Sequence, residues 1–213
     1  MSSADFLLSP EVQKLLQVLF SEPQKQFSAD ALAKRTKLST GDVTNTLEHL
    51  IKSGILTLHG AAGDGVETVS VDTSFVFYAE LRRIALKSFA AAEPLRRILR
   101  TKFKASVMRA FILEEDDDSK VELLVVHGEL VPDQADMAAA CGRLSASIGR
   151  HLTVHVISHD KYVSLTTRDA LGAKLAASSA FEIIGSGDTK AKAPTQPQGL
   201  LQSARRKLAA LTR

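Results

Sequence analysis

Five consecutive acidic residues, Glu114–Asp118, form the group in this sequence whose chemistry most needs an explanation. They lie between two apolar runs in the stretch RAFILEEDDDSKVELLVVHG, residues 109–128. Carboxylates gathered between two strands can hold Mg²⁺ or Ca²⁺, because both ions prefer oxygen ligands. Consecutive residues on a turn point in different directions, however, and seldom converge on one ion. We therefore expect a solvated hairpin tip, with an acidic contact surface and a loose divalent-metal site as the alternatives.

Three histidines spaced four residues apart, His151, His155 and His159, would share one face of a helix and suggest zinc. Their stretch, HLTVHVISH, is rich in β-branched residues and predicts a strand instead. On a strand, His151 and His155 would be about 13 Å apart, which is too far for one ion. We expect scattered surface histidines and no metal site. The single cysteine, Cys141, cannot form an internal disulfide and is expected to be a buried thiol.

The segment that contains these residues, 102–185, predicts strands that alternate with helices, which indicates an α/β domain. Before it, residues 75–101 predict one long basic helix, kinked at Pro94, that connects two domains and offers a candidate dimer surface. After it, residues 186–198 predict a flexible linker rich in Pro, Gly, Thr and Lys. The last segment, 199–213, predicts a basic amphipathic tail helix, which is a candidate binding segment for a protein partner.

The first part of the chain predicts a helix, a second helix, a short turn, a third helix and a β-hairpin. Ser9, Ser28 and Ser39 are suitable N-caps for the three helices. Asp42 follows Ser39 by three residues, so the two can form an arrangement like a capping box. Gly54 suits the end of the third helix. The hairpin is predicted from alternating apolar residues on both sides of the glycine-rich GAAGDG turn.

The stretch LAKRTKLSTGDVTNTLEHLIKSGIL resembles the second helix, turn, recognition helix and first wing strand of bacterial and archaeal winged helix-turn-helix regulators. The resemblance covers residues 10–72. It implies a domain over residues 1–74 that binds double-stranded DNA by placing its third helix in the major groove. The residues expected to contact DNA are Lys34, Arg35, Lys37, Ser39, Thr40, Thr44, Asn45, His49 and Lys52.

The net charge of +3 is unevenly distributed along the chain. Residues 1–75 carry six Lys or Arg against nine Asp or Glu, whereas residues 76–101 carry six against two. Residues 186–213 carry six basic residues and one acidic residue. Phosphate contacts supply much of the affinity for DNA, so an acidic first domain argues against DNA binding. The alternative function is a non-enzymatic protein–protein scaffold that uses the winged helix and the basic tail.

The stretch SKVELLV, residues 119–125, is similar to the Ser-Asp-Ile-Asp-Leu-Leu-Val motif of the minimal nucleotidyltransferase domain fused to many prokaryotic winged-helix regulators. In that family the two aspartates hold divalent metals. Ser119 matches the serine, but Lys120 replaces the first aspartate and Glu122 the second. An ammonium group cannot ligate a metal ion. The Gly-Ser that ends the family's preceding strand is also missing, so the resemblance implies a degenerate, catalytically inactive domain.

Together these patterns predict a two-domain protein of the α+β or α/β class. It consists of an N-terminal winged helix, a linking helix and a C-terminal nucleotidyltransferase-like α/β domain. We expect a sequence-specific DNA-binding transcriptional regulator that is not an enzyme, has no cofactor or metal, and forms a homodimer. No apolar run approaches the roughly 18 residues that a membrane span requires, and the N-terminus lacks the pattern of a secretory signal, so we expect a cytoplasmic protein.

Overall fold

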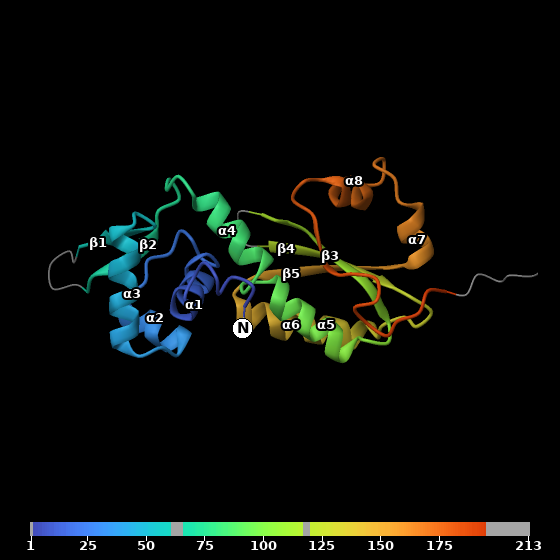
Figure 1. Cartoon of the computed structure of the whole chain (residues 1–213), viewed down its shortest axis with the longest axis horizontal. Coiled ribbons are helices and arrows are strands. Elements are labelled where there is room, and N and C mark those ends of the chain that lie inside the picture. Colours follow the sequence, from blue (N-terminus) through green and yellow to red (C-terminus); the bar gives the residue numbers. More distant parts are fainter. Residues whose placement is uncertain (1, 61–65, 117–119, 195–213) are drawn as a thin grey trace, which may run out of the picture.

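The computed structural model describes residues 2–60, 66–116 and 120–194, and has a mixed α/β fold with two sheets (Figure 1). The smaller sheet belongs to the N-terminal half and the four-stranded sheet to the C-terminal half. Within the described residues, no helix is long and apolar enough to cross a membrane. The tail segment 199–213, proposed above to bind a partner, lies outside the described residues.

The N-terminal half consists of three helices followed by an antiparallel hairpin. The predicted N-caps are confirmed, since the hydroxyls of Ser9, Ser28 and Ser39 each accept a hydrogen bond from the backbone N–H three residues on. A backbone bridge joins Phe27, which lies between α1 and α2, to Val69 of β2. The elements are α1 (Pro10–Leu19), α2 (Ala29–Thr36), α3 (Thr40–Lys52), β1 (Leu56–His59) and β2 (Thr68–Val71).

The connection between the halves is two helices, α4 (Tyr78–Lys87) and α5 (Ala92–Lys102), so the predicted single helix over 75–101 is wrong. The break precedes Pro94, which lies in the first turn of α5, where a missing N–H costs no hydrogen bond. The break is buried because its residues are divided between two cores. Ala85, Phe89 and Ala90 pack in the N-terminal core, whereas Leu86, Ala91 and Ala92 pack in the core of the larger sheet.

The C-terminal half is a four-stranded sheet with helices on both faces. Its strand order is β5-β4-β3-β6, with β3 antiparallel to both neighbours and β4 parallel to β5. In Figure 1, α5 and α6 lie on one side of the sheet and α7 and α8 on the other. The predicted order of strands and helices over 102–185 is confirmed. The elements are β3 (Val107–Glu115), β4 (Lys120–His127), α6 (Gln134–Ile148), β5 (His151–Ser158), α7 (His159–Ser164), α8 (Ala170–Ala176) and β6 (Phe181–Ile184).

The described part of the predicted flexible linker is hydrogen-bonded to the segments just before β3 and just after β4, which differs from the expectation for 186–198. The N–H of Lys190 donates to the carbonyl of Lys104 (2.8 Å), and the carbonyl of Lys192 accepts from the N–H of Glu129 (3.0 Å). A Cβ added at Gly128 would lie 1.9 Å from the Lys192 oxygen, so only glycine permits this approach. The backbone hydrogen bonds therefore extend the domain beyond its expected boundary.

The two halves also touch at the turn between α6 and β5. Gly149 has φ +66°, and an added Cβ there would lie 2.6 Å from Oγ and 2.9 Å from Cβ of Ser21, which follows α1. Both observations require glycine, because the left-handed backbone disfavours other residues and the space is already filled.

We predict that Gly149→Ala destabilises the protein. The left-handed backbone costs about 1–2 kcal/mol for alanine, and overpacking adds about 1–3 kcal/mol. Gly142→Ala is the matched control, since Gly142 lies in the middle of α6 with no atom within 4 Å of an added Cβ. That control should gain about 0.5–1 kcal/mol from reduced backbone entropy. Urea unfolding measures both changes, and an equal effect of the two substitutions would contradict the tight contact.

Candidate nucleic-acid interface and carboxylate cluster

Helix α3 presents a polar face to solvent in the N-terminal half. Val43, Leu47 and Leu50 are buried on its opposite face, which fixes the orientation of the helix. All nine residues expected to contact DNA are exposed: Lys34, Arg35, Lys37, Ser39, Thr40, Thr44, Asn45, His49 and Lys52. The structure therefore brings them together on one stretch of surface formed by the end of α2, the turn and α3.

The turn between α2 and α3 is short because Lys37 adopts a left-handed backbone with φ 59°. It is the only non-glycine residue with positive φ among those described. This conformation costs about 1–2 kcal/mol for a residue with a side chain. Glycine would avoid that cost, and the Lys37 side chain is exposed.

The nine residues differ in how free their side chains are. The Ser39 hydroxyl accepts from the N–H of Asp42 (3.1 Å) and donates to its carboxylate (2.6 Å), so the predicted capping arrangement occupies it. Arg35 pairs with Glu22, and Lys52 lies 3.5 Å from Glu48. Among the described residues, no side-chain hydrogen bond or ion pair is made by Lys34, Lys37, Thr44, Asn45 or His49.

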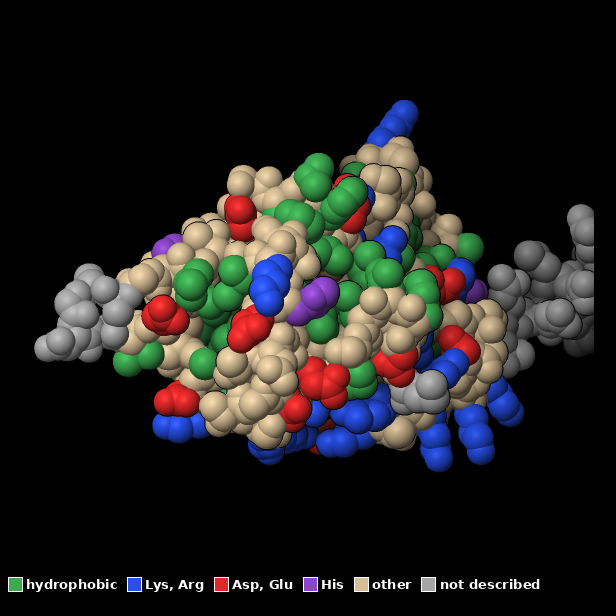
Figure 2. Space-filling view, turned by 60° about the vertical axis from the view of Figure 1, so that its left-hand side comes forward, with side chains coloured by type: hydrophobic (Ala, Val, Ile, Leu, Met, Phe, Trp, Pro, Cys, Tyr) green, Lys and Arg blue, Asp and Glu red, His purple; other side chains and the backbone are tan. Residues whose placement is uncertain are grey.

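Charge around this surface is mixed. On the face of the molecule that it draws, Figure 2 shows acidic side chains among apolar ones, and Lys and Arg side chains along the lower edge. That edge lies at the height of the α2–α3 turn and of α5 and α6 in Figure 1. The glycine-rich tip of the hairpin, 61–65, lies outside the described residues.

A β-bulge in β3 determines where the acidic run points. The register between β3 and β4 shifts at Leu113, which has no residue opposite it. As a result Glu114 pairs with Glu122 on the face that carries α8, and Glu115 pairs with Val121 on the opposite face. Two neighbouring carboxylates are thus placed on opposite sides of the sheet.

On the α8 side, Glu114 and Glu122 form a carboxylate cluster with Lys174 and His155. Two carboxylates directly opposite each other on paired strands repel. The Lys174 ammonium lies between them, 2.8 Å from Glu122 and hydrogen-bonded to Glu114. His155 Nε2 is 3.6 Å from the same Glu122 oxygen. One ammonium group from the chain itself therefore bridges the two carboxylates and reduces their repulsion.

The electrostatics of the carboxylate cluster favour its ion pairs. The hydrogen bond and positive charge of Lys174 lower the pKa of Glu122 below its ordinary value of 4.5, although partial burial opposes the shift. Hydrogen bonds to Glu114 and then Glu122 raise the pKa of Lys174 above 10.5. At neutral pH both partners are therefore charged. Lys120 and Glu122, the described residues of the expected degenerate motif, lie at the start of β4, and Ser119 lies outside the described residues.

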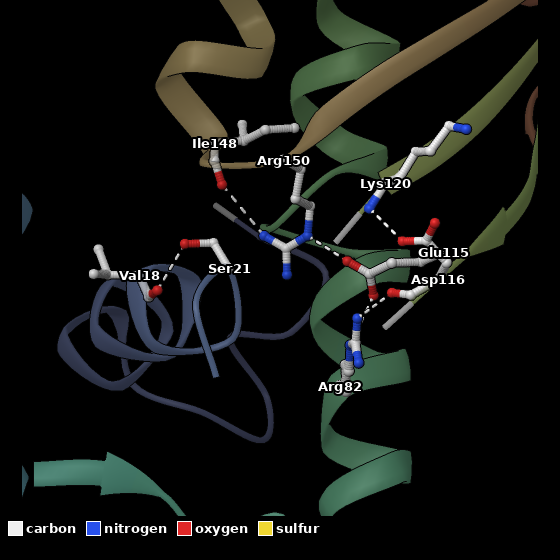
Figure 3. A network of polar contacts seen from close by, with 8 residues as sticks. All are labelled: Val18, Ser21, Arg82, Glu115, Asp116, Lys120, Ile148 and Arg150. Carbon is white, nitrogen blue, oxygen red and sulfur yellow. Dashed lines mark hydrogen bonds and ion pairs between the residues drawn. The ribbon is translucent and has the colours of Figure 1, made fainter. Parts of the chain in front are cut away.

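On the other side, Glu115 belongs to a buried triad with Arg82 and Arg150. Glu115 Oε1 accepts from Nε of Arg150 (2.6 Å) and Oε2 from Nε of Arg82 (3.1 Å). Figure 3 shows the carboxylate between the two guanidinium groups. The side chains of Arg150, Glu115 and Arg82 are 0%, 4% and 13% exposed. A solvated hairpin tip is therefore the wrong description for Glu115.

Sequence reasoning missed Lys174, Arg82 as a partner of Glu115, and Arg150. Arg150 lies between α6 and β5 and belongs to no motif, and the residues next to it in the sequence do not predict its burial. Cys141 is a buried free thiol as predicted, and burial raises its pKa. Within the described residues, no group of three or more His, Cys, Asp or Glu could hold a metal ion.

No protein-family model, curated protein or solved structure matches this chain.

We predict that two adjacent glutamates differ sharply in their contribution to stability. Glu115→Gln leaves two guanidinium groups together in the interior and should cost about 3–5 kcal/mol of unfolding free energy. Glu114→Gln changes a side chain that is 42% exposed and should cost less than about 1 kcal/mol. Urea unfolding at pH 7 checks the difference. Equal costs for the two variants would show that the triad does not hold the two halves together.

Proposed function

We propose that this chain is a sequence-specific transcriptional regulator that binds double-stranded DNA through a winged helix-turn-helix domain. The observation that carries the proposal is the α2–turn–α3 unit with its exposed polar face. The hairpin that follows, which Phe27 joins through one backbone bridge, supports it, because a small sheet after the third helix is typical of winged helices. Helix α3 would enter the major groove with its N-terminal residues toward the bases.

Within this proposal the nine exposed residues divide by chemistry. Asn45 has the amide that can bond adenine in the major groove, and Thr40 and Thr44 can meet bases or phosphates. Lys34 and Lys37 would contact phosphates on either side of the turn. Two acidic residues on α3 would repel the phosphates of DNA. Asp42 is bound by Ser39 and Glu48 lies beside Lys52, so both charges are partly compensated locally.

We propose that the chain forms a homodimer, because a DNA site with two-fold symmetry is bound by two copies of a chain. The middle of the connection over 75–101 is buried within the chain, so it does not supply the dimer contact that its sequence suggests. Val76 and Phe77, immediately before α4, are 76% and 59% exposed and are better placed. Large apolar side chains at such exposure are a common feature of protein contacts.

The C-terminal sheet is proposed to be a degenerate nucleotidyltransferase-like domain without catalytic activity. Lys120 stands at the first metal-binding position of the motif, and Lys174 neutralises Glu122 from α8. Only four residues join β3 to β4, which is too few for the helix that lies between these strands in the family. The domain would then act as a structural partner for the winged helix.

The DNA-binding proposal predicts that Lys37→Gly weakens binding without loss of stability. Glycine adopts the left-handed backbone of the turn without strain, and removal of the lysine side chain removes the phosphate contact. The slope of log affinity against log salt should fall by about 0.9 for each lost contact. Fluorescence anisotropy with the upstream region of the protein's own gene measures this, and sedimentation of the same complex reports two chains per site.

Lys161→Met is the control, since Lys161 lies on α7, in the other half of the chain. It should leave the affinity and its salt dependence unchanged. If Lys37→Gly and Asn45→Ala bind as the unaltered protein does, α3 is not the recognition helix. Failure to bind any DNA, together with capture of a protein by the N-terminal half, would instead support the scaffold function.

The proposed lack of nucleotidyltransferase activity is tested in a separate experiment. Incubation with radiolabelled nucleoside triphosphates and Mg²⁺ should leave no label on protein, nucleic acid or small-molecule acceptors. The physical reason is that Lys174 and Lys120 place positive charge where a metal ion would bind. Label that appears and is lost in Glu122→Gln would contradict the proposal and make the chain an enzyme.

A further inference from the structure

The two edge strands of the larger sheet, β5 and β6, differ in length and in how they are covered. Strand β6 is four residues long, and the carbonyl of Ile183 in it accepts a hydrogen bond from Nε of Arg96 on α5 (2.9 Å). A short and partly covered edge offers little backbone to another chain. Strand β5 is eight residues long, and no described strand lies beyond it.

The exposure of β5 indicates that its edge is open to solvent. In the neighbouring strand β4, residues 123–126 are 0% exposed. Residues 153–158 of β5 are also rich in β-branched side chains, yet each of them is partly exposed. In Figure 1, α6 lies on one side of the sheet and α7 on the other, so these helices cover the two faces of β5.

One hydrogen bond shows which backbone groups of β5 point away from β4. The N–H of Leu152 donates to Oγ of Ser145 on α6 (3.1 Å), so it takes no part in the ladder with β4. Successive residues of a strand direct their backbone groups to opposite sides, so those of Val154 and Val156 also point outward. Neither residue makes a backbone hydrogen bond to a described segment outside the sheet. An extended chain can pair with these groups.

The sequence of β5, HLTVHVIS, contains none of the residues that protect an edge strand. Natural sheets place charged residues, proline or bulges at exposed edges. Strand β5 has no Lys, Arg, Asp, Glu or Pro, and its register with β4 runs without a bulge from His151 to Ser158. Because the strand carries no acidic or basic charge of this kind, two copies of it can approach without like-charge repulsion.

We infer that β5 pairs with β5 of a second copy of this chain, antiparallel and about a two-fold axis at His155. In this register Val154 lies opposite Val156 of the second copy, and Val156 opposite its Val154. Each such pair exchanges both of its N–H···O bonds, so all the outward groups of these two residues are used. A register centred on Val154 would instead place Val156 opposite Leu152, whose N–H is already bonded.

The side chains fit the same register. Val154 and Val156 pack against the core that lies under α5 and α6. Across the contact they would meet the same residues of the second copy, and cross-strand pairs of β-branched residues stabilise a sheet. His155 lies on the opposite face, with Nε2 3.6 Å from Glu122, and would face its own counterpart. The two sheets would become one continuous sheet.

A second copy fits this edge better than the tail of the same chain does. The leucines of the segment 199–213 have helical spacing, so the tail predicts a helix and not a strand that could pair with β5. The inferred contact goes beyond the proposed function, because it does not depend on DNA and is separate from the exposed Val76 and Phe77. A chain with two different two-fold contacts assembles into a tetramer, and a chain with one into a dimer.

Disulfide cross-linking of the full chain without DNA tests the register. The two copies of His155 would form a pair without hydrogen bonds, whose Cα atoms are about 4.5 Å apart, within the roughly 4.4–6.8 Å that a disulfide spans. His155→Cys should therefore give a covalent dimer in oxidised glutathione. Val163→Cys, at a position 66% exposed on α7, is the control and should cross-link at least about tenfold more slowly. The unaltered protein, whose one cysteine is buried, gives the background. Equal rates for the two introduced cysteines would overturn the inference.

A proline at the edge tests the hydrogen bonds. Val154→Pro removes an N–H that points away from β4, so the ladder with β4 keeps its bonds. The mass of the particle in sedimentation should fall about twofold, from dimer to monomer or from tetramer to dimer. An unchanged mass would overturn the inference, and the cross-link decides the question if this variant does not fold.

A variant of the exposed patch before α4 separates the two contacts. Phe77→Lys should leave the His155→Cys cross-link intact, because the β5 edge does not include Phe77. Loss of the cross-link in that variant would place the contact at the patch and would also overturn the inference. A cross-link in a protein that binds no DNA would support the contact while the proposed function fails.

Discussion

The arrangement of the two halves depends on one buried carboxylate. Glu115 is nearly inaccessible to water, and an ionised carboxylate in such a place is tolerated only when its oxygens are paired. Its two partners come from different parts of the chain, Arg82 from α4 and Arg150 from the turn before β5. Because guanidinium groups bond in fixed directions, the triad fixes α4 against the end of β3 in the larger sheet. The contact between Ser21 and Gly149 closes the same junction from the other side.

The sequence predicts the features of this fold that have local causes. Ser39 and Asp42 start α3 as their spacing indicates, and the alternation of residues over 102–185 predicts each strand and helix in order. The features it misses have distant causes. The helix over 75–101 breaks because neighbouring residues in its middle pack in two different hydrophobic cores. The helical spacing of apolar residues in the sequence does not show which core each residue joins. Likewise, the direction of Glu114 and Glu115 depends on the bulge at Leu113, which is set by pairing with β4.

The features of the candidate site also divide into those with local causes and those with distant causes. The exposed residues of α3 could be predicted, because three buried positions at helical spacing fix the opposite face. The sequence does not predict which of these side chains lack an ion-pair partner, since Arg35 is paired with Glu22, thirteen residues earlier in the chain. The partner of Glu122 was also unpredictable. Lys174 lies on a short helix whose sequence has no motif, and it reaches Glu122 only because α8 packs over the sheet.

Three carboxylates on the two faces of the larger sheet, those of Glu114, Glu115 and Glu122, are paired with cations from the chain itself. On one face, Glu114 and Glu122 share the Lys174 ammonium, and on the other face Glu115 lies between Arg82 and Arg150. A metal ion or phosphate would have to displace these partners and break their hydrogen bonds.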